Sequence, residues 1–230
     1  MLSSPELYAQ KVVKLIGRPA SLYHLFGDSL SDRNLANGSA AMQNVADFKA
    51  VLRFCSEAAI PSSFVLPGVI NHGQSRQDAL DISAEVLQRM QDAAAQTSTT
   101  LSVEPHVHSY LESPELALEL LARVPGLQLT LDYAHLHCLG YSQSEIDVLV
   151  PYARHVHLRQ ARIGVLQTRL EYGTLNFPAL LASLRGAGYA GFLALEYVHQ
   201  EYMNTQCDHV LSETVKVRDL ARNWCELQTR

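Results

Sequence analysis

Four ionisable residues stand at or near the ends of short apolar segments in the part of the chain from residue 100 onward. They are Glu104, Asp132, His157 and Glu196, and they are separated by 28, 25 and 39 positions. Three carboxylates and one imidazole form a hard, mostly anionic ligand set, which favours Mn²⁺ or Mg²⁺ and also accepts Co²⁺ or Zn²⁺. Burying the carboxylates together without a cation would be costly. The pattern therefore predicts one bound divalent cation.

Each of these residues also has an ordinary structural interpretation. A carboxylate at a strand end can cap the following helix, and a single histidine is often no more than a hydrogen-bonded polar residue. His155 lies on the same strand face as His157, because side chains alternate along a strand, so either histidine could be the ligand. The joint pattern of four residues favours the metal interpretation over four separate coincidences.

The segments around these residues alternate between apolar runs and amphipathic stretches, as expected for βα units around a parallel sheet. We expect strands at 21–26, 62–66, 101–106, 127–132, 154–158 and 191–196, and helices at 6–16, 45–59, 77–95, 114–123, 144–153, 177–184 and 210–227. One βα unit takes about 30 residues, so successive strands deliver the four residues to the same face. Residues 28–43 are expected to form a mobile loop, either a substrate lid or an inert surface excursion.

Several motifs, in their order and spacing, resemble the xylose isomerase-like TIM-barrel superfamily. They are Val103-Glu104-Pro105-His106, Leu131-Asp132-Tyr133-Ala134-His135, His155-Val156-His157-Leu158-Arg159-Gln160, and the stretch from Gly173 through Gly188 to Glu196. The superfamily includes ketose 3-epimerases, inosose dehydratases, other sugar isomerases and an endonuclease IV branch. The resemblance implies an α/β, TIM-barrel-like fold, with residues 1–230 in a single domain.

The resemblance also implies roles for individual residues. The metal ligands would be Glu104, Asp132, His157 and Glu196, and the two glutamates would also act as the catalytic acid and base. Further candidates for contact with substrate are His135, Arg159, Arg162 and His106. A cation bound to a carbonyl and a neighbouring hydroxyl acidifies the C–H bond between them, so a proton can move through an enediolate. The implied function is a metal-dependent isomerase or epimerase of a sugar, a sugar phosphate or a keto-polyol.

Two other functions remain open at this point. An endonuclease IV-like phosphodiesterase would use several zinc ions and an Asp-x-His element after the strand of His157, but this chain has no Asp between Leu158 and Arg185. The chain also departs from the superfamily at Gln160, where Asp is common, and at Glu171, where Gly is common. A catalytically inactive binding protein is the second alternative.

The number of strands differs from that of a complete barrel. If Glu196 ends the eighth strand, then the strand at 21–26 is the third, which predicts about six of the eight βα units. An open sheet edge would need to be paired or covered, so a homodimer is one expectation. The incomplete barrel is also the reason for keeping the inactive alternative.

Composition limits the partners and the location. The net charge of −5 and the pI near 6.0 argue against a nucleic-acid partner. The resemblance implies a small-molecule sugar or polyol as substrate. The apolar runs are shorter than the ~20 residues that cross a bilayer, which argues against a membrane partner. The four cysteines lack paired spacing and the N-terminus lacks a signal-peptide pattern, which favours the cytoplasm.

Overall fold

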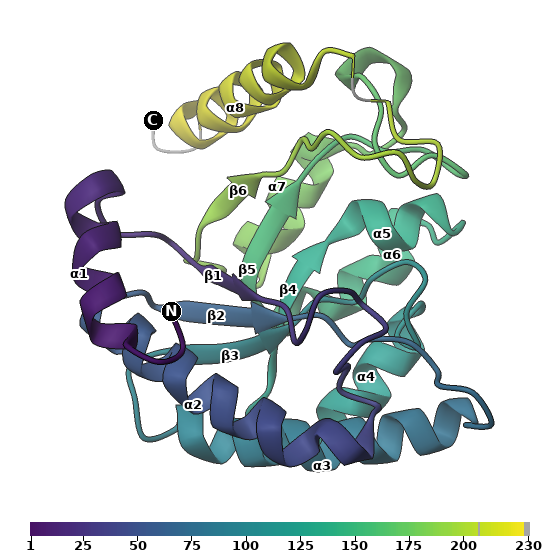
Figure 1. Ribbon diagram of the computed structural model, residues 1–230. Helices are drawn as coiled ribbons and strands as arrows, with labels where there is room; N and C mark the ends of the chain where they lie inside the picture. Colours follow the sequence, from purple (N-terminus) through teal and green to yellow (C-terminus); the bar gives the residue numbers. More distant parts are fainter. Residues whose placement is uncertain (207, 228–230) are drawn as a thin grey trace. The chain divides into compact units, whose positions relative to one another are not determined.

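The computed structural model describes residues 1–206 and 208–227 (Figure 1). The chain divides into two compact units. The first consists of Met1–Leu111 and Glu115–Thr130, and the second of Glu112–Pro114 and Leu131–Arg230. The expectation of a single domain stays a prediction.

Six strands form a sheet whose order follows the chain. They are β1 (Leu22–His24), β2 (Ser62–Val65), β3 (Thr100–Val103), β4 (Gln128–Asp132), β5 (Ala153–Leu158) and β6 (Leu193–Leu195). The pairing is parallel, with Val65 opposite Val103 in the first unit and His157 opposite Ala194 in the second. Parallel strands in chain order, alternating with helices, are the arrangement of a TIM barrel. The predicted fold class is therefore confirmed, with six strands in the described residues.

The first unit contains α1 (Pro5–Ile16), the 3₁₀ helix η1 (Gly38–Ala40), α2 (Ala41–Glu57), α3 (Arg76–Ala94) and most of α4 (Pro114–Arg123). Helix α2 packs against α1 and α3, and every residue of β2 is buried. Helix α3 begins with a capping box, in which Ser75 and Asp78 each accept a hydrogen bond from the backbone N–H of the other. A local cap therefore fixes the start of α3, and burial of apolar side chains holds the helices of this unit together.

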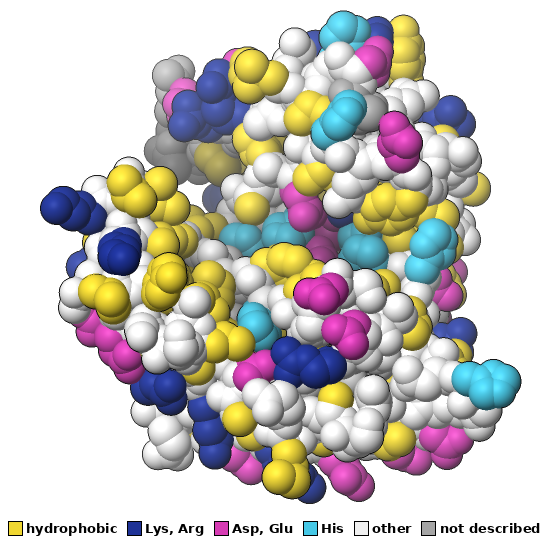
Figure 2. All heavy atoms as spheres, in the orientation of Figure 1, with side chains coloured by type: hydrophobic (Ala, Val, Ile, Leu, Met, Phe, Trp, Pro, Cys, Tyr) yellow, Lys and Arg dark blue, Asp and Glu magenta, His cyan; other side chains and the backbone are white. Residues whose placement is uncertain are grey.

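Helix α1 exposes apolar side chains. Leu7, Leu15 and Ile16 are 52%, 81% and 73% exposed, and Figure 2 shows hydrophobic side chains gathered over this helix. An apolar surface of this kind is what a covering partner would bury. The homodimer nevertheless stays a prediction.

The second unit contains α5 (Tyr133–Cys138), α6 (Gln143–Ile146), the 3₁₀ helices η2 (Asp147–Tyr152) and η3 (Leu170–Tyr172), α7 (Phe177–Gly186) and α8 (Val210–Leu227). Helix α7 begins as predicted, with Asn176 accepting a hydrogen bond from the Ala179 N–H and Pro178 in the first turn. Within residues 1–206 and 208–227, no helix is long and apolar enough to span a membrane.

Several sequence-based boundaries were wrong, among them the strand expected at 21–26, which is Leu22–His24. The helix expected at 144–153 is instead the short α6 followed by η2, because Pro151 has no N–H with which to continue an α-helix. The strand expected to reach residue 106 ends at Val103, two residues before Pro105. The strand expected at 191–196 is reduced to Leu193–Leu195. These changes place Glu104 and Glu196 just beyond their strands.

The segment after β1, which was expected to be a mobile loop, is anchored in the structure. Its residues Leu35 and Ala36 are buried. The Asn34 side chain donates to Asn71 Oδ1 and accepts from the Ala36 N–H, and Gln74 donates to the Ala36 carbonyl. Amide side chains therefore tie this segment to the loop after β2.

Candidate metal centre

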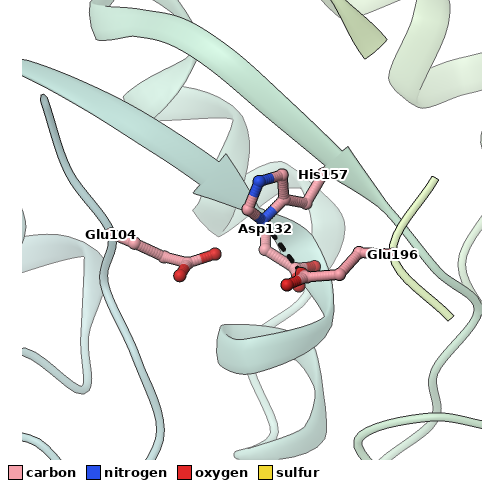
Figure 3. A group of neighbouring side chains, drawn as sticks. All are labelled: Glu104, Asp132, His157 and Glu196. Carbon is pink, nitrogen blue, oxygen red and sulfur yellow. Dashed lines mark ion pairs between the residues drawn. The ribbon is translucent and has the colours of Figure 1, made fainter. Parts of the chain in front are cut away.

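The four predicted metal ligands are brought together at strand ends. Asp132 is the last residue of β4, His157 lies in β5, and Glu104 and Glu196 directly follow β3 and β6. One ligand atom from each of the four residues lies within 4.8 Å of the others (Figure 3). The carboxyl ends of parallel strands meet at one edge of a sheet, which is why residues so far apart in sequence can form a group.

His157 and Glu196, which both belong to the second unit, are in direct contact. Strands β5 and β6 pair with Leu158 opposite Leu195, and the Glu196 N–H donates to the Leu158 carbonyl at 3.1 Å. This register sets the two side chains next to each other, with His157 Nδ1 2.9 Å from Glu196 Oε2. The His157 side chain is buried, whereas that of Glu196 is 32% exposed.

Asp132 has both a structural contact and a possible ligand role. Its Oδ1 accepts a hydrogen bond from the Ala134 N–H at 2.8 Å and so caps helix α5. Its Oδ2 accepts from Arg159 Nε at 2.8 Å and lies 2.5 Å from Arg159 Nη2. The helix-capping interpretation is therefore correct for Asp132, but the cap uses one of its two oxygens.

Arg159 lies among the site side chains, and its own side chain is 2% exposed. Besides Asp132, its Nη2 contacts Glu196 Oε2 at 3.3 Å and His135 Nε2 at 2.8 Å. A guanidinium can only donate, so His135 Nε2 must be an acceptor, and His135 is neutral with its proton on Nδ1. His135 Nε2 also lies 3.8 Å from Asp132 Oδ2, too far for a hydrogen bond, so the arginine contact decides the tautomer.

The remaining candidates differ in their surroundings. The Arg162 side chain is exposed, and the Arg162 backbone pairs with Val165. His106 is partly buried, with Nδ1 2.6 Å from the Val107 carbonyl. His155 packs its ring edge-on against His157 at 5.1 Å. Burial, aided by His157, lowers the pKa of His155 to about 4, so His155 is neutral near pH 7. Of the two histidines, the four-residue group contains His157.

The chain was compared with models of known protein families. A family model described as xylose isomerase-like TIM barrel matches residues 8–220. The chain belongs to this family. The resemblance seen in the sequence motifs is thereby confirmed.

Among curated proteins, this xylose isomerase-like chain is 27% identical over 159 residues to the human protein named "Putative hydroxypyruvate isomerase". The match covers 64% of this chain and 57% of the human protein, so it spans less than two thirds of that relative's length.

Two solved structures share the fold of this xylose isomerase-like chain. A D-tagatose 3-epimerase-like protein superposes with a TM-score of 0.74 and 17% identity, covering 98% of this chain and 83% of that one. The IOLI protein, solved with a bound zinc atom, superposes with a TM-score of 0.71 and 17% identity, covering 96% and 82%. At this identity the likeness establishes the fold alone.

The residues of the xylose isomerase-like site fit one divalent cation. Two ligand atoms on opposite sides of a Mg²⁺ or Zn²⁺ ion lie about 4.2 Å apart. The 4.8 Å limit of the group is within roughly half an ångström of this separation, which a small rotation of a carboxylate can close. Three carboxylates and the Arg159 guanidinium leave a net charge of −2 with His157 neutral. A divalent cation would neutralise that charge.

Sequence reasoning missed the residues that order the loop after β5. The Gln160 side chain donates to the Leu175 carbonyl and accepts from the N–H groups of Ala161 and Leu175. A Cβ atom at Gly173 would lie 2.1 Å from Gln160 Cγ, so this loop needs a glycine there. The Gln160 N–H donates to the Tyr197 hydroxyl, next to Glu196. The departure at Gln160 was visible in the sequence, but its partners were not.

Proposed function

We propose that this chain is a divalent-metal-dependent isomerase or epimerase that acts on a sugar, a sugar phosphate or a keto-polyol. The observation that carries the proposal is the grouping of Glu104, Asp132, His157 and Glu196, whose ligand atoms lie within 4.8 Å of one another. Two glutamates in one metal site suit a reaction that moves a proton between carbon positions. The names of the relatives, a hydroxypyruvate isomerase and a 3-epimerase-like protein, support the same reaction class.

The proposed chemistry divides the four ligands into two pairs. A divalent cation would supply Lewis-acid polarisation of a carbonyl oxygen and a neighbouring hydroxyl oxygen. Asp132 and His157 serve to hold it. One of the two glutamates, Glu104 or Glu196, takes the proton from the carbon next to the carbonyl, and the electron pair of that C–H bond moves to form the enediolate. The other glutamate returns a proton to carbon.

Arg159 and His135 have supporting roles in this proposal. The Arg159 guanidinium is a permanent cation that can only donate hydrogen bonds, and it donates to Asp132 and approaches Glu196. These contacts orient two carboxylates and lower their repulsion before a cation binds. Neutral His135 accepts from Arg159 and so holds the guanidinium in turn.

Proton exchange with solvent is the direct test. The protein, freed of metal with EDTA and reloaded with Mn²⁺, Mg²⁺, Co²⁺ or Zn²⁺, would be incubated in D₂O with hydroxypyruvate, a set of ketoses and a set of inososes. We expect metal-dependent loss of one substrate C–H signal by NMR. The Glu196→Gln variant should exchange at least about 100-fold more slowly. Glu201→Gln, which changes an exposed glutamate five positions away, should match the wild type.

The outcome separates the candidate functions. Absence of exchange across all substrates and metals would overturn the proposal. Cleavage of abasic DNA by the zinc-loaded protein would point to a phosphodiesterase instead. Metal binding without either activity would favour a binding protein.

A further inference from the structure

Glu196 is held differently from Asp132 and His157. Asp132 and His157 belong to strands of five and six residues, whereas Glu196 follows the three-residue strand β6. One backbone hydrogen bond, from the Glu196 N–H to the Leu158 carbonyl, continues the pairing to Glu196 itself. The path of the chain after Glu196 must therefore be set by contacts from elsewhere.

Gln167 supplies such contacts. Gln167 is fully buried, and its Nε2 donates to the carbonyls of Val198 and Gln206, each at 2.9 Å. Its Oε1 accepts from the Val198 N–H at 2.8 Å. A backbone N–H can only donate, so the orientation of the amide is fixed by Val198. One side chain thus binds both ends of the segment 198–206.

The backbone and a second side chain complete this connection. The Leu166 N–H donates to the Met203 carbonyl, and the Gln206 N–H donates to the Gln167 carbonyl. The Thr168 hydroxyl donates to Gln206 Oε1 at 2.8 Å. The loop after β5 and the segment after β6 are therefore joined at several points. The Gln160 N–H bonds the Tyr197 hydroxyl, and the Gln167 amide bonds both backbone groups of Val198, two residues after Glu196.

We propose that Gln167 is a positioning residue for Glu196. By fixing Val198, two residues further along the chain, its amide keeps the Glu196 carboxylate 2.9 Å from His157 Nδ1 and 3.3 Å from Arg159 Nη2. Without the amide, the half-buried backbone groups of Val198 would have to find other partners, and the segment that begins at Glu196 would shift. The effect on catalysis rests on the proposed function, whereas the effect on the His157–Glu196 contact does not.

The chain offers a matched control in Gln143. This side chain also binds both backbone groups of a single residue, donating to the Asn176 carbonyl at 3.1 Å and accepting from the Asn176 N–H at 3.0 Å. Gln143 lies in the same unit, as the first residue of α6, and its partner Asn176 is the residue that caps α7. Gln143→Met and Gln167→Met therefore remove the same kind of bond, at the cap of a helix in one case and beside Glu196 in the other.

The test compares these variants in the metal-free protein first. The ¹⁵N chemical shift of His157 Nδ1 reports its contact with Glu196 without any metal or substrate. We expect this shift to change in Gln167→Met and to stay at the wild-type value in Gln143→Met. Mn²⁺ titration by calorimetry should then show a dissociation constant at least tenfold higher in Gln167→Met alone. Turnover, where exchange is observed, should lose kcat with little change in KM.

A second variant guards against misfolding. Gln167→Asn keeps an amide but is one methylene shorter, which leaves room for a water molecule to satisfy the backbone groups. It should fold and still change the His157 signal and the Mn²⁺ affinity. A wild-type His157 signal and wild-type Mn²⁺ affinity in both Gln167 variants would overturn the positioning role. Failure of the wild type to bind Mn²⁺ would instead overturn the proposed function, and the His157 signal would still decide the role of Gln167.

Discussion

His157 Nδ1 lies 2.9 Å from Glu196 Oε2, although the two residues are 39 positions apart in the sequence. The parallel register of β5 and β6 explains the contact. It sets Leu158 opposite Leu195, and this brings Glu196, the residue after Leu195, next to His157. A separation near 3 Å suits two neighbouring ligands of one cation as well as it suits a hydrogen bond. The same separation therefore suits both the metal-free protein and the protein with a bound cation.

Arg159 is predicted to stabilise the metal-free protein. Its guanidinium contacts Asp132 and Glu196, and the Asp132 side chain is 1% exposed. Arg159→Met leaves the buried Asp132 carboxylate without its cationic partner, which should lower the free energy of unfolding by about 3 kcal/mol. Urea denaturation of the EDTA-treated protein measures this loss. Arg162→Met, which changes an exposed arginine, is the control and should stay within about 0.5 kcal/mol of wild type.

Added Mn²⁺ should recover part of the stability lost in Arg159→Met. A divalent cation compensates the same carboxylates, and a ligand that binds the folded state raises its stability. An Arg159→Met protein that is as stable without metal as the Arg162→Met control would contradict this account of the buried charges.

Gly68 is predicted to be intolerant of any side chain. Its φ is +93°, and a Cβ atom there would lie 2.2 Å from Asn34 Cβ. Gly73 has a similar φ of +75°, but nothing lies within 4 Å of its would-be Cβ. Gly73→Ala should therefore lower the free energy of unfolding by roughly 1 kcal/mol, for the backbone conformation alone. Gly68→Ala should lower it by about 3 kcal/mol, because the new methyl group also clashes with Asn34. Equal losses in thermal denaturation would show that Asn34 moves aside freely.

The sequence predicted helices and strands best where neighbouring residues alone determine the structure. The bounds of α4 and α8 match the predicted ranges, since the apolar residues of both segments recur at helical spacing. The strand positions of Asp132 and His157 followed from apolar runs that end in an ionisable residue. Helix α5 was missed because six residues carry too little periodicity to detect, although its cap, Asp132, was already singled out.

The rest of the site depends on contacts between distant segments. Contact of Arg159 with substrate stays a prediction. Its contacts with Asp132, Glu196 and His135, which are 27, 37 and 24 positions away, could not be predicted from the sequence. Gln167 was not singled out at all, because a glutamine in a polar loop carries no signal of burial. Which polar side chain becomes buried and paired is decided by tertiary packing.

Cys55 is predicted to be unreactive in the folded protein. Burial raises the pKa of its thiol to about 12, so almost no thiolate forms at pH 8. Iodoacetamide should modify the exposed Cys225 and leave Cys55 unmodified until urea is added, as read by peptide mass spectrometry. Rapid labelling of Cys55 without urea would contradict its burial.

The same pKa shift makes a pH-dependent contribution to stability. The folded-state pKa of Cys55 lies above its ordinary value of 9.0, so the folded state holds this proton more tightly than the unfolded state. The contribution is complete below pH 9 and is lost as the pH rises toward 12, by at most about 1.4 kcal/mol per pH unit. Between pH 9 and 10.5 the wild type should lose more stability than Cys55→Ala. Parallel losses in the two proteins would contradict this assignment.

Calorimetric titration of the EDTA-treated protein with Mn²⁺ tests the metal centre most directly. We expect one ion per chain. The dissociation constant should be at least about 100-fold higher in His157→Asn and in Asp132→Asn, and near the wild-type value in His155→Asn. Absence of Mn²⁺ binding in the wild type, or a loss of affinity in His155→Asn with none in His157→Asn, would contradict this expectation.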